Sequence, residues 1–446
     1  MGINPIQQLK NKLSSVNYQL QYQAELADKL LENNNNSEID EIERLSKENN
    51  KYFQTNLNIQ INQKLQNKIV TLEVECLDGE KIIIRCRNGF LNIDQQLDTQ
   101  EIQAPQVSFD KMINDKNPYQ IIATMRCLSQ ENHQIKKLRS WLIKLQEKLK
   151  NESESQISYL IINDRTSFEI PWEMLELTKN NYLGASIVTV RWQDMTNPDD
   201  LDDVNSLINL KIEENNCYGN MVAYLNTKDL PSVKEEQKHI EKIKPIFQND
   251  IYSLFNFLDT CKSDISLIFI ASHGFFGDDL SKNKLGEEDI KKQISLIELY
   301  EYDFDFLTKN PSLVFMNTCH SGRLQQDDSL YIVDHNSETG KYYPMGFSTF
   351  FLKKGAAGVI GTLCKVADKY AAIVSRNFFE EYKENPHLSV ATILKNLRLK
   401  AIQKYQSEKN QSEKNDDNKL SLIFTFMYIY YGNPMTTLNI IPHEEN

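Results

Sequence analysis

The sequence of 446 residues lacks the features of membrane, secreted and metal-binding proteins. No apolar run approaches the roughly 18 residues that cross a bilayer, and residues 1–20 are polar, without the apolar core of a signal peptide. The seven cysteines are dispersed, with no CxxC pair and no metal-ligand spacing. An odd, dispersed set of cysteines without a secretion signal indicates a reducing compartment. We therefore expect a cytoplasmic protein with no membrane anchor and no metal or other cofactor.

The sequence also lacks an excess of basic residues. It contains 50 Lys and Arg against 62 Asp and Glu, a formal net charge of −12. This balance argues against nucleic acid or an anionic membrane surface as a direct partner. Hydrophobic residues make up 40% of the chain, so a sizeable core can form. The length allows one large α/β domain with an extension, or two or three domains.

The first 152 residues are predicted to form two regions. Apolar residues recur at helical spacing over 1–66, which predicts a helical or coiled-coil arm; a solvated, partly disordered tail is the alternative. Over 67–152, Asp78-Gly79 separates two β-branched runs, a strong hairpin signal. Residues 131–150 then place a set of apolar side chains on one helix face: Ile135, Leu138, Leu142, Leu145 and Leu149. We expect 67–152 to be a small regulatory region made of this hairpin and helix.

From residue 153 onward, apolar runs alternate with helical patterns. Strands are predicted at 158–163, 186–192, 220–226, 265–272, 312–318, 357–363 and 424–432, and helices at 232–246, 346–354, 367–384 and 388–405. Near-continuous apolar strands separated by helices are typical of a mainly parallel sheet covered on both faces. The polar, repeat-containing segment 403–420 is expected to be a mobile loop. The predicted fold class is α/β, a mainly parallel sheet flanked by helices, with an N-terminal helical and β-hairpin extension.

Two of these strands end in reactive residues. The strand at 265–272 is followed by His273-Gly274, and the strand at 312–318 by Cys319. Functional residues of an open parallel sheet gather beyond the carboxyl ends of its strands. A cysteine there can act as a nucleophile, with a histidine that raises its thiolate fraction and protonates the leaving amine. The N–H groups of Cys319 and Gly274 are the candidate oxyanion donors.

Each of these residues also has a less specific interpretation. A cysteine on a strand is usually a small hydrophobic residue of the core. A single histidine is no stronger evidence for a catalytic site. Taken together, His273 and Cys319 share strand-end placement, flanking glycines and a separation of 46 residues, close to the roughly 50 residues of caspases. His320 adjoins Cys319, so its side chain should point away from the cleft. Cys364 also follows a strand, but no comparable histidine precedes it.

Several blocks of the sequence, in the same order, resemble a CHAT domain. They are "DRTSFEIPWEML" (164–175), "LNTKDLPSVKEEQKHI" (225–240), "FIASHGFFGDD" (269–279), "FMNTCHSG" (315–322), "GFSTFFLKKGAAGVIGTLCKVAD" (346–368) and "YIYYGNP" (428–434). CHAT domains are a branch of the caspase-like cysteine peptidases, which also include separases, gingipains and metacaspases. The resemblance implies a caspase-like domain over 153–446, with a degenerate first half (153–215) and a catalytic second half (216–446). Within the first block, Trp172 is expected to be a core aromatic and Pro171 to start a helix that contains Glu173.

The sequence departs from metacaspases two residues before the nucleophile. Metacaspases have an aspartate there, which helps to bind a basic P1 side chain, whereas this chain has Asn317. The P1 preference of metacaspases therefore cannot be transferred. Asp229, Asp278 and Asp279 are candidates for an acidic substrate pocket, although acids in such loops are more often simply solvated.

The resemblance implies a cysteine endopeptidase that acts on a protein substrate through an acyl-enzyme. Relatives of this type are often latent until a partner or signal releases them, frequently in bacterial defence, including antiviral defence, or in regulated cell death. Residues 1–150 are then expected to bind an activating protein or sensor complex. The polar segment 325–345 matches in place the activation loops of caspases, with Arg323 and Lys341 as candidate self-cleavage points. A non-catalytic interaction scaffold and an acyltransferase or ligase are the alternatives.

Overall fold

The computed structural model of the chain describes most of the predicted domain. The described residues are 59–61, 68–76, 81–88, 96–103, 118–153, 157–166, 170–193, 210–277, 279–325, 345–407 and 415–444. Within the predicted arm, 59–61 form strand β1 (Ile59–Ile61), which pairs in parallel with β9 (Leu210–Ile212). The remainder of that arm, Asp278 and Lys341 lie outside the described residues.

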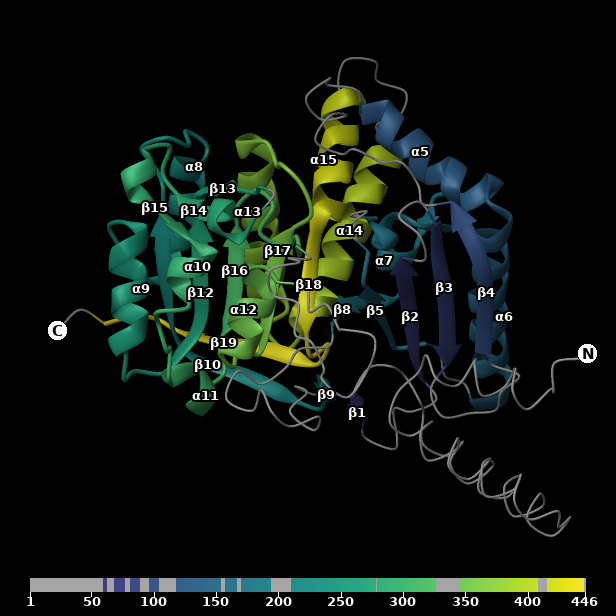
Figure 1. Cartoon of the computed structure of the whole chain (residues 1–446), viewed down its shortest axis with the longest axis horizontal. Helices are drawn as coiled ribbons and strands as arrows, with labels where there is room; N and C mark the ends of the chain where they lie inside the picture. The colour runs from purple at the N-terminus through teal and green to yellow at the C-terminus, as the bar shows by residue number, and fades with distance from the viewer. Residues whose placement is uncertain are drawn as a thin grey trace, which may run out of the picture.

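One large sheet organises the described part of the chain (Figure 1). Twelve strands form it: β2 (Ile69–Cys76), β3 (Lys81–Asn88), β4 (Gln96–Gln103), β5 (Tyr159–Asp164), β8 (Val188–Arg191), β10 (Asn215–Leu225), β11 (Ile246–Gln248), β12 (Ile265–Ala271), β16 (Leu313–Asn317), β17 (Gly358–Thr362), β18 (Tyr428–Gly432) and β19 (Thr436–Ile441). Their order is β11-β10-β12-β16-β17-β18-β8-β5-β2-β3-β4, and β19 pairs with β10. The strands β10, β12, β16 and β17 are parallel, as the apolar runs predict.

The predicted hairpin is confirmed and extends this sheet. Strands β2 and β3 are antiparallel, with Cys76 opposite Ile82, on either side of Asp78-Gly79. Strand β2 also pairs in parallel with β5. In Figure 1 the hairpin and β4 therefore continue the sheet at the end opposite β10 and β12. The boundaries predicted at 66 and 152 stay predictions.

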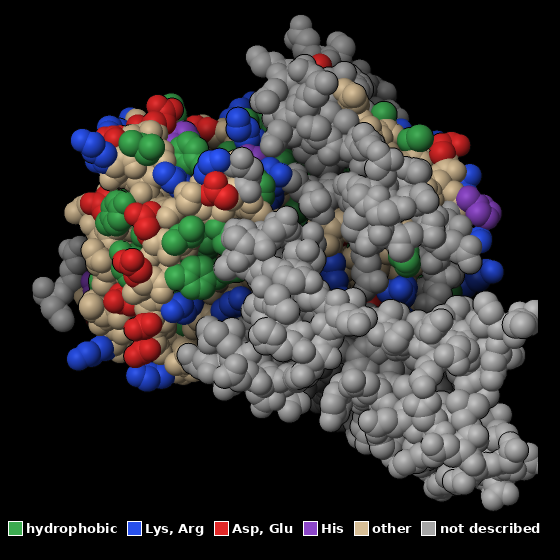
Figure 2. Space-filling view, viewed as in Figure 1, with side chains coloured by type: hydrophobic (Ala, Val, Ile, Leu, Met, Phe, Trp, Pro, Cys, Tyr) green, Lys and Arg blue, Asp and Glu red, His purple; other side chains and the backbone are tan. Residues whose placement is uncertain are grey.

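Helices flank the sheet. The longer ones are α5 (Pro118–Glu131), α6 (His133–Ser153), α8 (Val233–Ile240), α9 (Ile251–Thr260), α12 (Phe347–Lys353), α13 (Asp368–Glu384), α14 (Val390–Ser407) and α15 (Asn415–Met427). Helix α6 buries the predicted apolar face from Ile135 to Leu149. None of the helices in the described ranges combines the length and apolar character needed to span a bilayer. On the face in Figure 2, Lys and Arg lie interspersed with Asp and Glu over the described surface.

Two predictions near the C-terminus were wrong in part. The run 424–432 was predicted to be strand, but α15 continues through Met427 and only Tyr428–Gly432 form β18. A short apolar run fits a buried helix and a buried strand equally well, so periodicity cannot separate them. The predicted loop 403–420 is helical at both ends, since α14 reaches Ser407 and α15 begins at Asn415.

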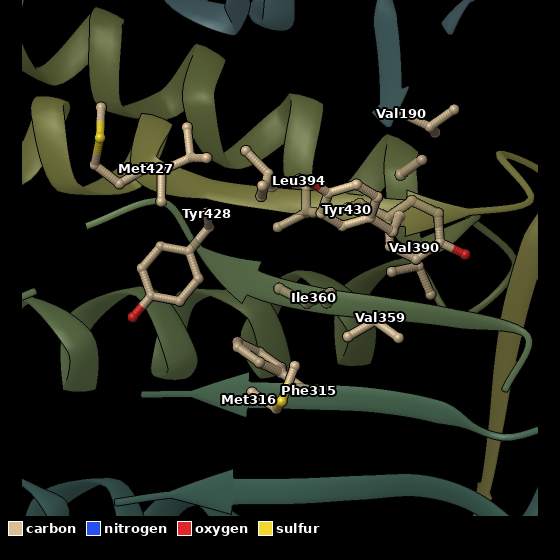
Figure 3. Packing of buried hydrophobic residues seen from close by; sticks show 14 of the residues in the cluster. Val190, Phe315, Met316, Val359, Ile360, Val390, Leu394, Met427, Tyr428 and Tyr430 are labelled. Atoms are coloured by element: carbon tan, nitrogen blue, oxygen red, sulfur yellow. The ribbon is translucent and has the colours of Figure 1, made fainter. Parts of the chain in front are cut away.

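The core joins the central strands to α14 (Figure 3). Phe315 of β16, Ile360 of β17 and Tyr428 of β18 are fully buried. Strand β18 runs antiparallel to β17 and parallel to β8, so it connects the two halves of the sheet. This α/β architecture is the predicted one. It aligns the carboxyl ends of β10, β12 and β16 at one edge, where the candidate site lies.

Candidate functional site

Strand register brings His273 and Cys319 to the same edge of the sheet. Strands β12 and β16 are parallel neighbours, and their last paired residues are Ala271 and Asn317. His273 and Cys319 each follow two residues later. His273 begins β13 (His273–Phe275), part of a small antiparallel sheet with β14 (Lys284–Gly286) and β15 (Gln293–Ser295).

A cavity of about 210 Å³ lies beside both residues. It is lined by Leu230, Val233, Ser272, His273, Asn317, Thr318, Cys319, Val366, Asp368, Ala371 and Tyr428. The thiol is partly exposed, and no other cysteine lines this cavity. The cavity therefore places the Cys319 thiol and the His273 imidazole beside one enclosed space.

Gly274 packs directly against the backbone of Cys319. A Cβ atom at position 274 would lie 2.0 Å from the carbonyl oxygen of Cys319 and 3.0 Å from its nitrogen. Neither backbone atom can move without displacing a strand end. Glycine is required here because β13 must approach Cys319 closely, and this contact fixes where His273 stands relative to the thiol.

We expect Gly274→Ala to slow alkylation of Cys319 by about 100-fold, because a displacement of roughly 1 Å between reacting groups has that effect. The rate constant for labelling by an electrophilic peptide, read by intact mass, measures it. Gly277→Ala is the matched control, since its Cβ would meet the Lys282 side chain instead. A wild-type rate in Gly274→Ala would contradict the tight packing of β13 on Cys319.

The Cys319 thiol is held by the loop after β17. Its Sγ accepts the Val366 N–H at 3.4 Å and lies 3.6 Å from the Val366 carbonyl oxygen. His320, the neighbouring residue, has a left-handed backbone with φ of 60°. Its ring is buried beside Phe276, and its Nδ1 faces the Arg323 guanidinium at 3.2 Å. His320 does not line the cavity, as its position next to Cys319 predicts.

Two acids lie near the His273 ring, Glu288 and Asp229. The Nε2 atom is buried, makes no hydrogen bond with any residue that the structure describes, and lies 3.9 Å from the Glu288 carboxylate. Asp229 accepts hydrogen bonds from the Glu288 N–H and the Asn226 amide, each at 3.0 Å. These bonds, together with the nearby positive groups, lower the pKa of Asp229. Asp229 thus stabilises the loop that presents Glu288 to His273.

Asp279, another predicted substrate-binding acid, lies outside the lining of the cavity. Asp279 caps a short 3₁₀ turn at Leu280–Lys282 and forms an ion pair with Lys282 at 3.2 Å. Neither Asp229 nor Asp279 lines the cavity, and Asp278 lies outside the described residues. Asn317 does line it. Its amide donates to the Glu236 carboxyl at 2.7 Å, and its oxygen accepts from the Tyr428 hydroxyl.

Sequence reasoning missed Asp368 and Glu236. Asp368 lines the cavity from the first turn of α13. Glu236, on α8, is 1% exposed and is hydrogen-bonded to Asn317. The sequence held one signal for it, because Glu236 falls on the apolar stripe of that helix, between Val233 and Ile240. No cluster of three or more His, Cys, Asp and Glu suited to a metal occurs among the residues that the structure describes.

Solved structures with a similar arrangement are distant. Two crystal structures of the Saccharomyces cerevisiae separase–securin complex align with TM-scores of 0.43 and 0.42, at 14% and 13% identity, over 92% and 84% of this chain. The chain spans only about a third of those proteins, 32% and 31%. The complex of pro- and mature domains of Porphyromonas gingivalis RgpB gives a TM-score of 0.35 at 11% identity, covering 66% of this chain and 69% of that one.

Sequence comparison is more specific. No curated protein sequence matches this chain. The family model described as the CHAT domain matches residues 133–418, which is more than half of the chain and includes α6 through α14. Both strand ends of the candidate site lie inside that match. The chain belongs to the CHAT domain family.

Proposed function

We propose that this protein is a cysteine endopeptidase in which Cys319 is the nucleophile and His273 the acid–base group. The observation that carries the proposal is the convergence of both side chains on one cavity from adjacent parallel strands. The substrate is a protein, because a peptide chain can place its scissile bond over Cys319 and one side chain in the cavity. Membership of the CHAT domain family supports the same chemistry.

The mechanism follows from the groups present. The Cys319 thiolate attacks the scissile carbonyl carbon, and the Cys319 and Gly274 N–H groups donate to the oxyanion. His273 then protonates the leaving amine as the carbon–nitrogen bond breaks, which leaves a thioester. Water attacks the thioester, His273 takes its proton, and the acid product and free thiol are released. No step requires a metal.

The resting arrangement supports latency. The thiol interacts with the Val366 backbone, and His273 Nε2 has no hydrogen-bond partner. A conformational signal that draws the imidazole closer to the thiol would raise the thiolate fraction above the value that His273 already maintains at rest. We assign this signal to a protein partner that binds through residues 1–150, in a bacterial defence or cell-death system. Cleavage at Arg323 or Lys341 is a second route to the same rearrangement.

We expect iodoacetamide to alkylate Cys319 of the wild type at least about 100-fold faster than Cys319 of His273→Ala, the usual loss when an acid–base partner is removed. Intact mass and peptide mapping measure both rates. Exposed Cys127 is an internal control whose alkylation should not depend on His273. Cys319→Ala should abolish labelling at that position and cleavage of any protein substrate. Equal alkylation of Cys319 in the presence and absence of His273 would reject the catalytic pair.

A further inference from the structure

Two carboxyl groups, one lining the cavity beside Cys319 and one behind its lining, form no ion pair with the residues that the structure describes. Asp368 lines its wall; one oxygen accepts the Ser232 N–H at 2.7 Å, and Asp368 has no ion-pair partner among the described residues. Glu236 lies beneath the floor. One of its oxygens accepts from the Asn317 amide at 2.7 Å; the other is buried, makes no hydrogen bond of regular geometry with the described residues, and the Ser375 hydroxyl lies near enough to this carboxyl to lower its pKa. Two buried or half-buried acids near each other destabilise the empty site.

Two facing walls of the cavity are apolar, although Ser272 and Thr318 also line it. Leu230 and Val233 come from the loop after β10 and the start of α8, while Val366 and Ala371 flank the start of α13. The Ser232–Asp368 hydrogen bond ties these two walls together. Such walls suit the methylene chain of a long side chain, whose polar end then reaches Asp368 and Asn317. An apolar end group would instead remove water from Asp368 without offering it a partner.

We propose that this cavity is the S1 pocket and that it selects peptides with Lys or Arg at P1, with Asp368 pairing with the cation and Glu236 acting through Asn317. This inference rests on the proposed peptidase function. Position 317 is an amide rather than an acid, so the negative charge comes from α13 and α8 and not from the strand that carries the nucleophile. Asp368 contacts the substrate; Glu236 is a positioning residue.

The protonation of Glu236 agrees with this role. Burial, aided by the neighbouring Asp368 charge, raises the pKa of Glu236 to about 8, against the opposing effect of its hydrogen-bond partners Ser375 and Asn317. At neutral pH the Glu236 carboxyl of the empty site is therefore mostly protonated. A cation at Asn317 and Asp368 favours the ionised form of Glu236, which strengthens binding of basic side chains. An acidic P1 side chain would be repelled by Asp368.

The test uses the full chain and electrophilic ketone peptides that differ only at P1: Lys, Arg, Met, Leu, Gln and Asp. The rate constant for labelling Cys319 is measured by intact mass for each. We expect wild type to prefer Lys or Arg. Asp368→Asn, which keeps the acceptor for Ser232, should lower the Lys-to-Met rate ratio by about 100-fold, and Glu236→Gln by roughly tenfold.

Matched controls are Glu380→Gln and Glu235→Gln, which remove an exposed charge from α13 and α8 respectively. Both should keep the wild-type ratio. A general structural defect would lower the Lys and Met rates together and leave their ratio unchanged. Preference for Met, Leu, Gln or Asp, or an unchanged ratio in Asp368→Asn, overturns the inference while His273-dependent alkylation of Cys319 still supports the peptidase. Loss of that alkylation overturns both.

Discussion

Glu173→Ala is expected to lower the free energy of unfolding by about 4 kcal/mol, the usual effect of breaking a buried ion pair by removing one partner. Glu173 lies in a 3₁₀ turn at Trp172–Met174 and is 1% exposed. Its two carboxylate oxygens accept from Nε and Nη2 of Arg191, at 2.9 and 2.7 Å. Arg191 is itself 4% exposed, so the substitution leaves a buried guanidinium without this counter-charge.

A second buried guanidinium makes the effect larger. Arg398 of α14 is 1% exposed and donates to the carbonyl oxygens of Gly184 and Tyr428 at 3.3 and 2.7 Å. Burial and repulsion from Arg191 lower the pKa of Arg398 to about 10, which the Glu173 charge partly offsets. Although burial alone would raise it, the pKa of Glu173 is lowered by Arg191 and Arg398. One carboxylate thus stabilises two cations, from β8 and from α14.

The unfolding free energies of wild type, Glu173→Ala and Glu173→Gln are measured by urea denaturation. Glu173→Gln keeps the side-chain shape but removes the negative charge. Its free energy of unfolding should therefore fall nearly as far as that of Glu173→Ala. Exposed Glu384→Gln is the control and should change little. Adding Arg398→Met to Glu173→Ala should recover part of the loss. A decrease below about 1 kcal/mol in Glu173→Ala would show that the two guanidinium groups do not depend on this carboxylate.

This buried network shows what the sequence could and could not predict. Trp172 was expected in the core, and it is fully buried, with its indole N–H donating to Asp164 at 2.7 Å. Pro171 does precede the turn that contains Glu173. The partners of that turn could not be read from sequence, because Arg191 and Arg398 come from elements 18 and 225 residues away. Only the assembled sheet brings these charges together.

The candidate site divides in the same way. Strand ends at His273 and Cys319 were predictable, since apolar β-branched runs locate strands and parallel pairing brings their ends together. The acids were not. Asp229 looked like a pocket residue, but it is bound to the Glu288 N–H, 59 residues later. The pocket wall at Asp368 depends on how α13 packs against α8, which no local pattern encodes.

The pH dependence of stability should change when Glu236 is replaced by glutamine. Burial raises the pKa of Glu236 from 4.5 to about 8. Between these pH values the folded protein holds a proton that the unfolded chain releases, so stability falls as pH rises through this window, and this dependence ends above pH 8. At about 1.4 kcal/mol per pH unit, the free energy of unfolding falls by about 5 kcal/mol in total across this window.

Glu236→Gln has no such proton to lose. Its side-chain oxygen can still accept from Asn317, so at pH 5 its unfolding free energy should match that of wild type. At pH 9 it should be more stable by about 4 to 5 kcal/mol. Urea denaturation at both pH values tests this, with Glu235→Gln as the exposed neighbour that should follow wild type throughout. An equal pH dependence in wild type and Glu236→Gln would mean that Glu236 is ionised in the folded protein. The carboxyl beneath Asn317 would then already be charged before any substrate binds.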